Sequence, residues 1–140
     1  MHIKFAHLLA VAVLMTAVHF TAIRVGWYEG GVLVDMPLHF LGGILAGMTW
    51  LWVMPYLSLG ASSRLATALG AVALATLGSF LWELLEFGFS TFFPEYALPL
   101  KLYSSTVSDV LSDVALGILG GIALALVYLR RSPAGRKAGQ

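Results

Sequence analysis

The sequence predicts an all-α, polytopic membrane protein built as a four-transmembrane-helix bundle. Hydrophobic residues make up 59% of the 140 residues and charged residues only 11%, far from the composition of a soluble domain. The charges gather in short stretches between long apolar runs. Four of these runs are long enough to cross a hydrocarbon core of about 30 Å, which takes roughly 20 helical residues.

The predicted spans cover residues 5–23, 37–57, 65–88 and 107–129. The first follows Lys4 as a signal peptide would, but no small-x-small cleavage site comes after it, so we interpret it as a retained helix. Together the spans form one predicted transmembrane domain, residues 1–131. The polar, glycine-containing residues 132–140 are predicted to be a disordered cytoplasmic tail.

The connections between the last three spans differ in length. Residues 58–64 form a tight predicted turn, whereas residues 89–106 are a long segment with Pro94 and Pro99, which we expect to exclude continued helix. Two interpretations of this long segment remain open. It folds over the outer mouth of the bundle, or it is an interfacial connector with aromatic anchors.

Basic residues predict the orientation, because cytoplasmic loops retain Lys and Arg. Four spans put both termini on one side, so one face carries six basic residues and the other carries only Arg24 and Lys101. We therefore expect a bacterial inner (cytoplasmic) membrane protein with cytoplasmic N- and C-termini. The residues on the cytoplasmic face are Lys4, Arg64, Arg130, Arg131, Arg136 and Lys137. Predicted aromatic belts comprise Trp50, Trp52, Tyr56 and Tyr128 at this face and Trp27, Tyr28, Tyr96 and Tyr103 at the other.

Several classes of function are excluded by composition. A net charge of +1, without a basic patch interleaved with aromatics, argues against nucleic-acid binding. The absence of cysteine excludes disulfides, thiolate metal sites and a cysteine nucleophile. The sequence contains no Ser-His-Asp spacing, phosphate-binding glycine loop or nucleotide motif, so the catalytic residues and the reaction class stay unknown.

The acidic residues are the main functional signal, because all seven lie in or near the predicted outer half. Residues three or four positions apart share a helix face, so acids spaced in this way point the same way into a bundle. Carboxylates with one imidazole suit Mg²⁺, Mn²⁺, Ca²⁺ or, less exclusively, Zn²⁺. We therefore predict a divalent metal ion as the cofactor. The candidate ligands are Asp35, His39, Glu83, Glu86, Asp109 and Asp113.

Other roles are open for several of these residues. Asp35 precedes Met36-Pro37 as an N-cap would, and Thr106-x-x-Asp109 reads as a capping box, so capping and metal binding have equal weight at both sites. Glu86 lies near the outer boundary, where water would solvate its carboxylate. A lone histidine such as His39 is more often a hydrogen-bonded core residue than a metal ligand.

Glu83 and Asp113 lie deeper than the other acids, roughly two turns inside their spans. Ionised carboxylates at the centre of a span cost roughly 2.5–3.5 kcal/mol each, so such groups are usually paired or functional. Five acids of the candidate set face only Arg24 and Lys101 as fixed cations. A bound cation, protons on the carboxylates, or basic groups of a lipid headgroup or partner subunit would neutralise them.

Small residues continue the polar stripes toward the inner half. Gly43 and Gly47 follow His39, and Gly117 and Gly121 follow Asp113, each pair with small-x-x-x-small spacing. This spacing lets helix backbones approach closely. We therefore expect the second, third and fourth spans to pack against one another.

Three motifs follow one another along the chain: Asp35-Met-Pro-Leu-His39-Phe-Leu-Gly-Gly43, Trp82-Glu83-Leu-Leu-Glu86 and Thr106-Val-Ser-Asp109-Val-Leu-Ser-Asp113-Val-Ala-Leu-Gly117. In this order they resemble the YjdF-like uncharacterised bacterial inner-membrane proteins, and more distantly the VanZ-like family associated with glycopeptide resistance. The resemblance covers residues 35–121 and implies fold and membrane location, but no activity. It implies that the six candidate ligands match polar positions of the family. In this chain Met36-Pro37 replaces an expected basic residue, which makes the cluster more anionic.

Three functions compete on these observations. The leading hypothesis is a divalent-cation site open to the outer face, acting on a lipid-linked or envelope substrate, with membrane lipids as partners. The second is a non-catalytic accessory or assembly subunit whose acids or glycine faces meet other membrane-protein subunits. The third, ion or proton transport, is disfavoured because between Gly43 and Leu57 only Thr49 and the indoles are polar.

Overall fold

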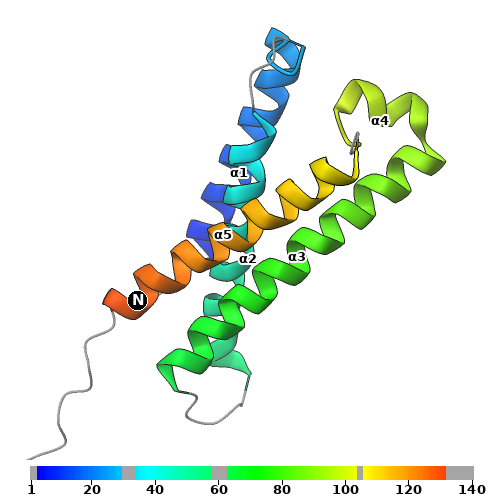
Figure 1. Cartoon of the computed structure of the whole chain (residues 1–140). Helices are drawn as coiled ribbons and strands as arrows, with labels where there is room; N and C mark the ends of the chain where they lie inside the picture. The colour runs from blue at the N-terminus through cyan, green and yellow to red at the C-terminus, as the bar shows by residue number, and fades with distance from the viewer. Residues whose placement is uncertain (1–2, 30–33, 58–62, 104–105, 132–140) are drawn as a thin grey trace, which may run out of the picture.

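The computed structural model describes residues 3–29, 34–57, 63–103 and 106–131, and its architecture is all-α, as predicted. Four of its helices are long and apolar enough to cross a membrane, which confirms the four-span class. The predicted turn at residues 58–64 and the predicted tail at 132–140 fall wholly or mostly outside the described residues. The elements are α1 (Phe5–Val25), α2 (Asp35–Val53), the 3₁₀ turn η1 (Met54–Tyr56), α3 (Arg64–Phe92), α4 (Pro94–Leu100) and α5 (Val107–Arg131) (Figure 1).

Helices α2, α3 and α5 pack pairwise on one another, and α1 lies mainly against α2. At one end of the bundle the ring of Phe5, which begins α1, is 5.6 Å from that of Trp52 near the end of α2. At the same end Arg64 donates a hydrogen bond to the carbonyl of Leu129, joining the start of α3 to the end of α5. The four long helices therefore run alternately up and down, with α4 at the opposite end (Figure 1).

The two ends differ in charge. We call the end with Lys4, Arg64, Arg130 and Arg131 the basic end. The other, the acidic end, contains Asp35, Glu83, Glu86, Asp109 and Asp113.

Glycines set the close packing of the three core helices. A Cβ atom on Gly43 would overlap the carbonyl oxygen of Gly117, and a Cβ on Gly121 would overlap the side chain of Ala75. Gly120, which belongs to neither predicted small-residue pair, fits in the same way against the carbonyl of Phe40. The absence of a Cβ atom at these positions allows the helix backbones to approach closely. The predicted contact among the three spans is therefore confirmed.

The segment after the third predicted span is more helical than expected. Helix α3 continues to Phe92 and stops before Pro94, which has no N–H and disfavours helical geometry in the residue before it. Pro94 then occupies the first turn of α4, where its missing N–H costs nothing. The expectation that Pro99 excludes helix is wrong. Pro99 lies near the end of α4, and Glu95, whose carbonyl it would have bonded, is exposed.

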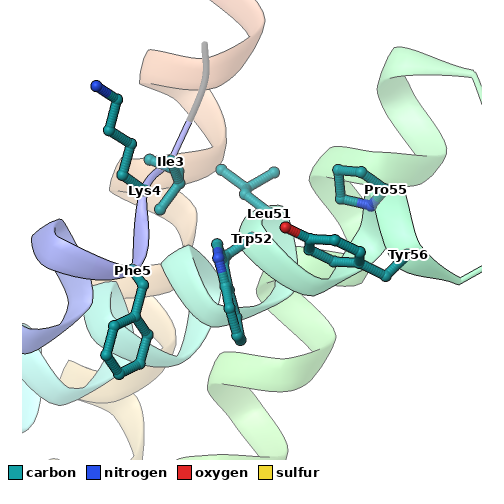
Figure 2. Close-up of a pocket in the computed structure, with 7 residues that line it drawn as sticks. All are labelled: Ile3, Lys4, Phe5, Leu51, Trp52, Pro55 and Tyr56. Carbon is teal, nitrogen blue, oxygen red and sulfur yellow. The ribbon is translucent and has the colours of Figure 1, made fainter.

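Aromatic side chains gather at the basic end, as predicted. The rings of Trp52 and Tyr56 lie 5.9 Å apart, and with Phe5 and Lys4 they line a cavity of about 330 Å³ (Figure 2). Trp50 packs inward, where its indole N–H donates to the carbonyl of Thr67 at 2.9 Å. It therefore joins α2 to α3.

Candidate metal centre

The buried imidazole of His39 is the centre of the acidic cluster. Its Nε2 atom lies 3.6 Å from Asp35 Oδ1 and 3.8 Å from Asp113 Oδ2. Its Nδ1 atom, on the other side of the ring, lies 3.7 Å from Glu83 Oε1. Three helices thus direct carboxylates toward one ring, two of them toward the same nitrogen.

Local helix geometry explains this convergence. Asp35 and His39 are one turn apart on α2, and residues at this spacing share a face. Asp113 precedes Gly117 by one turn of α5, and a Cβ on Gly117 would overlap the hydroxyl of Ser79. The glycine therefore brings α5 close enough to α3 and α2 for Asp113 to reach the histidine.

Burial divides the cluster into an enclosed part and an open part. The side chains of His39, Glu83 and Asp113 are only 5–6% exposed, whereas that of Asp35 is 48% exposed. Enclosed carboxylates lose hydration, which makes a positive partner favourable. Asp35 is the side chain with room to move.

The spacing of the donor atoms is compatible with a divalent cation. In the described part of the chain, one ligand atom each from Asp35, His39 and Asp113 lies within 4.8 Å of the others. Two ligands on opposite sides of one ion are separated by about 4.6–5.2 Å for Ca²⁺ and about 4.0–4.2 Å for Mg²⁺. Separations of up to 4.8 Å are within the range spanned by ligands around a calcium-sized ion, and the exposed Asp35 has room to rotate inward toward a smaller one.

The remaining predicted ligands lie around this group. Glu83 faces the Nδ1 side of the ring, while Glu86 is buried and accepts a hydrogen bond from the Trp82 indole at 2.9 Å. Asp109 is half-buried one turn before Asp113. Neither Glu86 nor Asp109 belongs to the three-residue group of close donor atoms.

The structure tests the two predicted helix caps, one by Asp35 at the start of α2 and one by Thr106 at the start of α5. The N-cap of α2 is Val34, whose side chain makes no capping hydrogen bond, so the N-cap interpretation of Asp35 is wrong. Helix α2 begins two residues before the predicted Pro37 because proline is tolerated within the first turn. At α5 the Thr106 hydroxyl accepts a hydrogen bond from the Asp109 backbone N–H at 3.1 Å. The expected capping contact by Thr106 is therefore confirmed.

A second polar group, which no sequence motif indicates, lies at the acidic end. His19 contacts the hydroxyl of Tyr28 through Nδ1 at 2.8 Å and the carbonyl of Leu100 through Nε2 at 3.0 Å. The partners His19 and Leu100 are 81 residues apart, so no local pattern indicates their contact. Burial, with a smaller contribution from the Asp35 carboxylate, raises the pKa of Tyr28 to about 12.

Lys101 forms an ion pair at the surface. Its ammonium lies 2.7 Å from Glu29 Oε1, and this contact lowers the pKa of Glu29 and raises that of Lys101. One of the two basic residues available to offset the acids is therefore already paired with another acid.

A groove of about 720 Å³ runs along α2 beside the cluster. Residues of α1, α2 and α3 form its walls, and Leu100, Lys101 and Leu102 line it near the acidic end. Asp35, His39 and Glu86 also line it, so the metal-ligand candidates on α2 face this space.

Comparison with known proteins supports the membrane assignment. No curated protein and no solved structure matches the chain. The YjdF-like and VanZ-like names stay predictions, since the matching family model carries neither name. That model, described as predicted membrane protein (DUF2238), matches residues 1–133, and the chain therefore belongs to this family.

Proposed function

We propose that the protein binds a divalent cation at the acidic end through Asp35, His39 Nε2 and Asp113. The observation that carries this proposal is the approach of two carboxylates, from α2 and α5, to the same buried imidazole nitrogen. A cation there would compensate carboxylates that are costly to keep ionised inside membrane-spanning helices. The ion would polarise a phosphoryl or carbonyl oxygen of a lipid-linked or envelope substrate.

Glu83 has a positioning role in this proposal. Metal-binding histidines usually direct their second ring nitrogen to a carboxylate, which selects the tautomer and orients the ring. The position of Glu83 Oε1, 3.7 Å from Nδ1, supports this role, because it would favour a hydrogen on Nδ1 and leave Nε2 to bind metal. Asp35 and Asp113 are then ligands, and Glu83 acts through His39.

We place the acidic end on the outer side of a bacterial inner membrane, with the termini in the cytoplasm. The basic end carries Lys4, Arg64, Arg130 and Arg131, and an excess of basic residues is typical of cytoplasmic ends. A metal ion would then reach the site from the outer side of the membrane.

Mn²⁺ binding to the purified full-length protein tests the site. We expect bound Mn²⁺ by electron paramagnetic resonance and a rise in thermal stability, since a ligand at 100 times its Kd stabilises by about 2.7 kcal/mol. Glu83→Gln should weaken Mn²⁺ binding by about 10–100-fold, as expected for a residue that orients a ligand. Asp113→Asn should weaken it more, because a ligand is lost directly.

Asp109→Asn is the matched control, since it makes the same chemical change one turn away on α5. It should leave Mn²⁺ affinity close to that of the wild type. The proposal is wrong if the wild type is insensitive to Mn²⁺ and chelator while Glu83→Gln and Asp113→Asn are both more stable. That result would indicate mutually repelling carboxylates without a cation.

A further inference from the structure

The groove between α1 and α3 joins two chemically different regions. Along most of its length the walls are apolar, with Met15 from α1, Leu45 from α2 and Leu74 from α3. At the acidic end the walls are polar, with Asp35, His39 and Glu86. A molecule that fills it must therefore have an apolar body and a polar head.

The groove and the metal centre share two residues. Asp35 and His39 line both, whereas Asp113 approaches His39 from α5 and does not line the groove. A cation held by these three residues would therefore have protein on the α5 side and its remaining coordination positions on the groove side. A head that enters the groove would meet the ion there.

The size of the groove favours a lipid chain over another transmembrane helix as the occupant. A helix about 10 Å wide has a cross-section of about 80 Å², so the groove's 720 Å³ would hold only about 9 Å of helix, or roughly six residues. A spanning helix needs roughly 20 residues. The volume instead lies in the range of small-molecule sites, about 300–1,000 Å³. Because the walls belong to membrane-spanning helices, the available apolar chains are those of lipids.

We infer that the groove binds one chain of a membrane lipid whose phosphate headgroup lies at the acidic end and binds the cation. This inference rests on the proposed function. Ions such as Mg²⁺ are commonly held by one or two carboxylates together with phosphate oxygens, which matches the incomplete set of Asp35, His39 and Asp113. Asp35 and Glu86 repel a phosphate when no metal ion is present, and Lys101 at the same end is already paired with Glu29, so the lipid binds more tightly with metal.

Native mass spectrometry of the full-length protein in detergent tests this inference with three probes. Dioleoyl phosphatidic acid has chains and phosphate, dioleoylglycerol lacks the phosphate, and glycerol phosphate lacks the chains. We expect phosphatidic acid to be retained about tenfold more in Mn²⁺ than in chelator, a difference of about 1.4 kcal/mol. Dioleoylglycerol should show no metal dependence, and glycerol phosphate should not be retained.

Two variants fill the groove from different walls. A Cβ on Gly42 lies 3.6 Å from the terminal methyl of Met15, so the rest of a leucine side chain in Gly42→Leu extends into the groove. Ala12→Phe fills it from α1. Both should lose phosphatidic acid while binding Mn²⁺ as the wild type does, which also shows that they are folded. Gly88→Leu, where a Cβ meets nothing within 4 Å, is the control and should retain the lipid.

The outcomes separate this inference from the metal site. Mn²⁺ binding without retention of phosphatidic acid, or equal retention by the two filled variants, would overturn the lipid groove and leave the metal site intact. Retention of glycerol phosphate as strongly as phosphatidic acid would also overturn it, because the chain would then contribute nothing. Absence of Mn²⁺ binding in the assay with metal alone would overturn the proposed function itself.

Discussion

Two hydrogen bonds at the acidic end determine which ring nitrogen of a neutral His19 carries the hydrogen. A carbonyl oxygen only accepts, so the hydrogen bond to Leu100 requires the hydrogen on Nε2. In the neutral ring Nδ1 then accepts from the hydroxyl of Tyr28. Tyr28 must be protonated to donate, and its burial keeps it so. These contacts tie the end of α1 to the end of α4 and support the end of the groove.

The raised pKa of Tyr28 predicts a late step in an alkaline titration. Its folded-state pKa of about 12 exceeds the unfolded value of about 10, so its contribution to stability is full below pH about 10 and is lost as pH rises through about 12. Phenolate absorbance of the folded protein should therefore show a component near pH 12 that Tyr28→Phe removes. Tyr56→Phe, at a side chain 74% exposed, is the control and should keep it. An unchanged titration in Tyr28→Phe would contradict the assignment.

At the scale of the helices, close contact of α2, α3 and α5 positions the cluster. Gly43 meets Gly117, and Gly117 in turn meets Ser79, one turn from Glu83. These contacts lie one helical turn from His39, Glu83 and Asp113, toward the basic end. A change in helix separation here would therefore move the carboxylates away from the imidazole as well as weaken packing.

Gly117→Leu and Gly121→Leu should lower the thermal unfolding midpoint more than Leu119→Ala. Overpacking typically costs about 1–3 kcal/mol, and at Gly117 and Gly121 the new atoms overlap neighbouring helices. The Leu119 side chain is 52% exposed, so its truncation removes little packing within the protein. Circular dichroism in detergent measures the midpoints. Equal tolerance of all three changes would mean that the glycine face is not a packing interface.

At the scale of the whole molecule, alternating helix direction puts all the cluster acids at one end. With four spans, the ends of α1 and α3 and the starts of α2 and α5 meet there. An odd number of spans would distribute the same residues over both sides of the membrane. Topology therefore determines whether a single site exists.

Reporter fusions test this topology. Fusions after Arg64 and after Gln140 should report the cytoplasm, and fusions near Gly30 and Glu95 should report the outer side, because ends rich in Lys and Arg are typically retained in the cytoplasm. A fully inverted pattern would keep the bundle but place the acidic end in the cytoplasm. A pattern in which Arg64 and Gln140 fall on different sides would contradict the four-span arrangement.

Local patterns predicted the helices well and their ends less well. Apolar length alone identified the four spans. A helix of any sequence needs about 20 apolar residues to cross the bilayer, and it satisfies its backbone hydrogen bonds internally. The ends depend on neighbours. Pro37 lies inside α2 and Pro99 inside α4, because a proline in a first turn, or near an exposed helix end, leaves few backbone groups unsatisfied.

The all-α membrane class, the close glycine contacts and the gathering of acids at one end follow from the sequence alone, because length, composition and helical periodicity are local properties. The packing of the helices is needed to show that Asp35 and Asp113 share one nitrogen of His39 while Glu83 faces the other. It also decided that Glu86 lines a groove formed by α1, α2 and α3. Periodicity places a residue on a face of its own helix, but which faces meet, and at what depth, depends on how the helices pack.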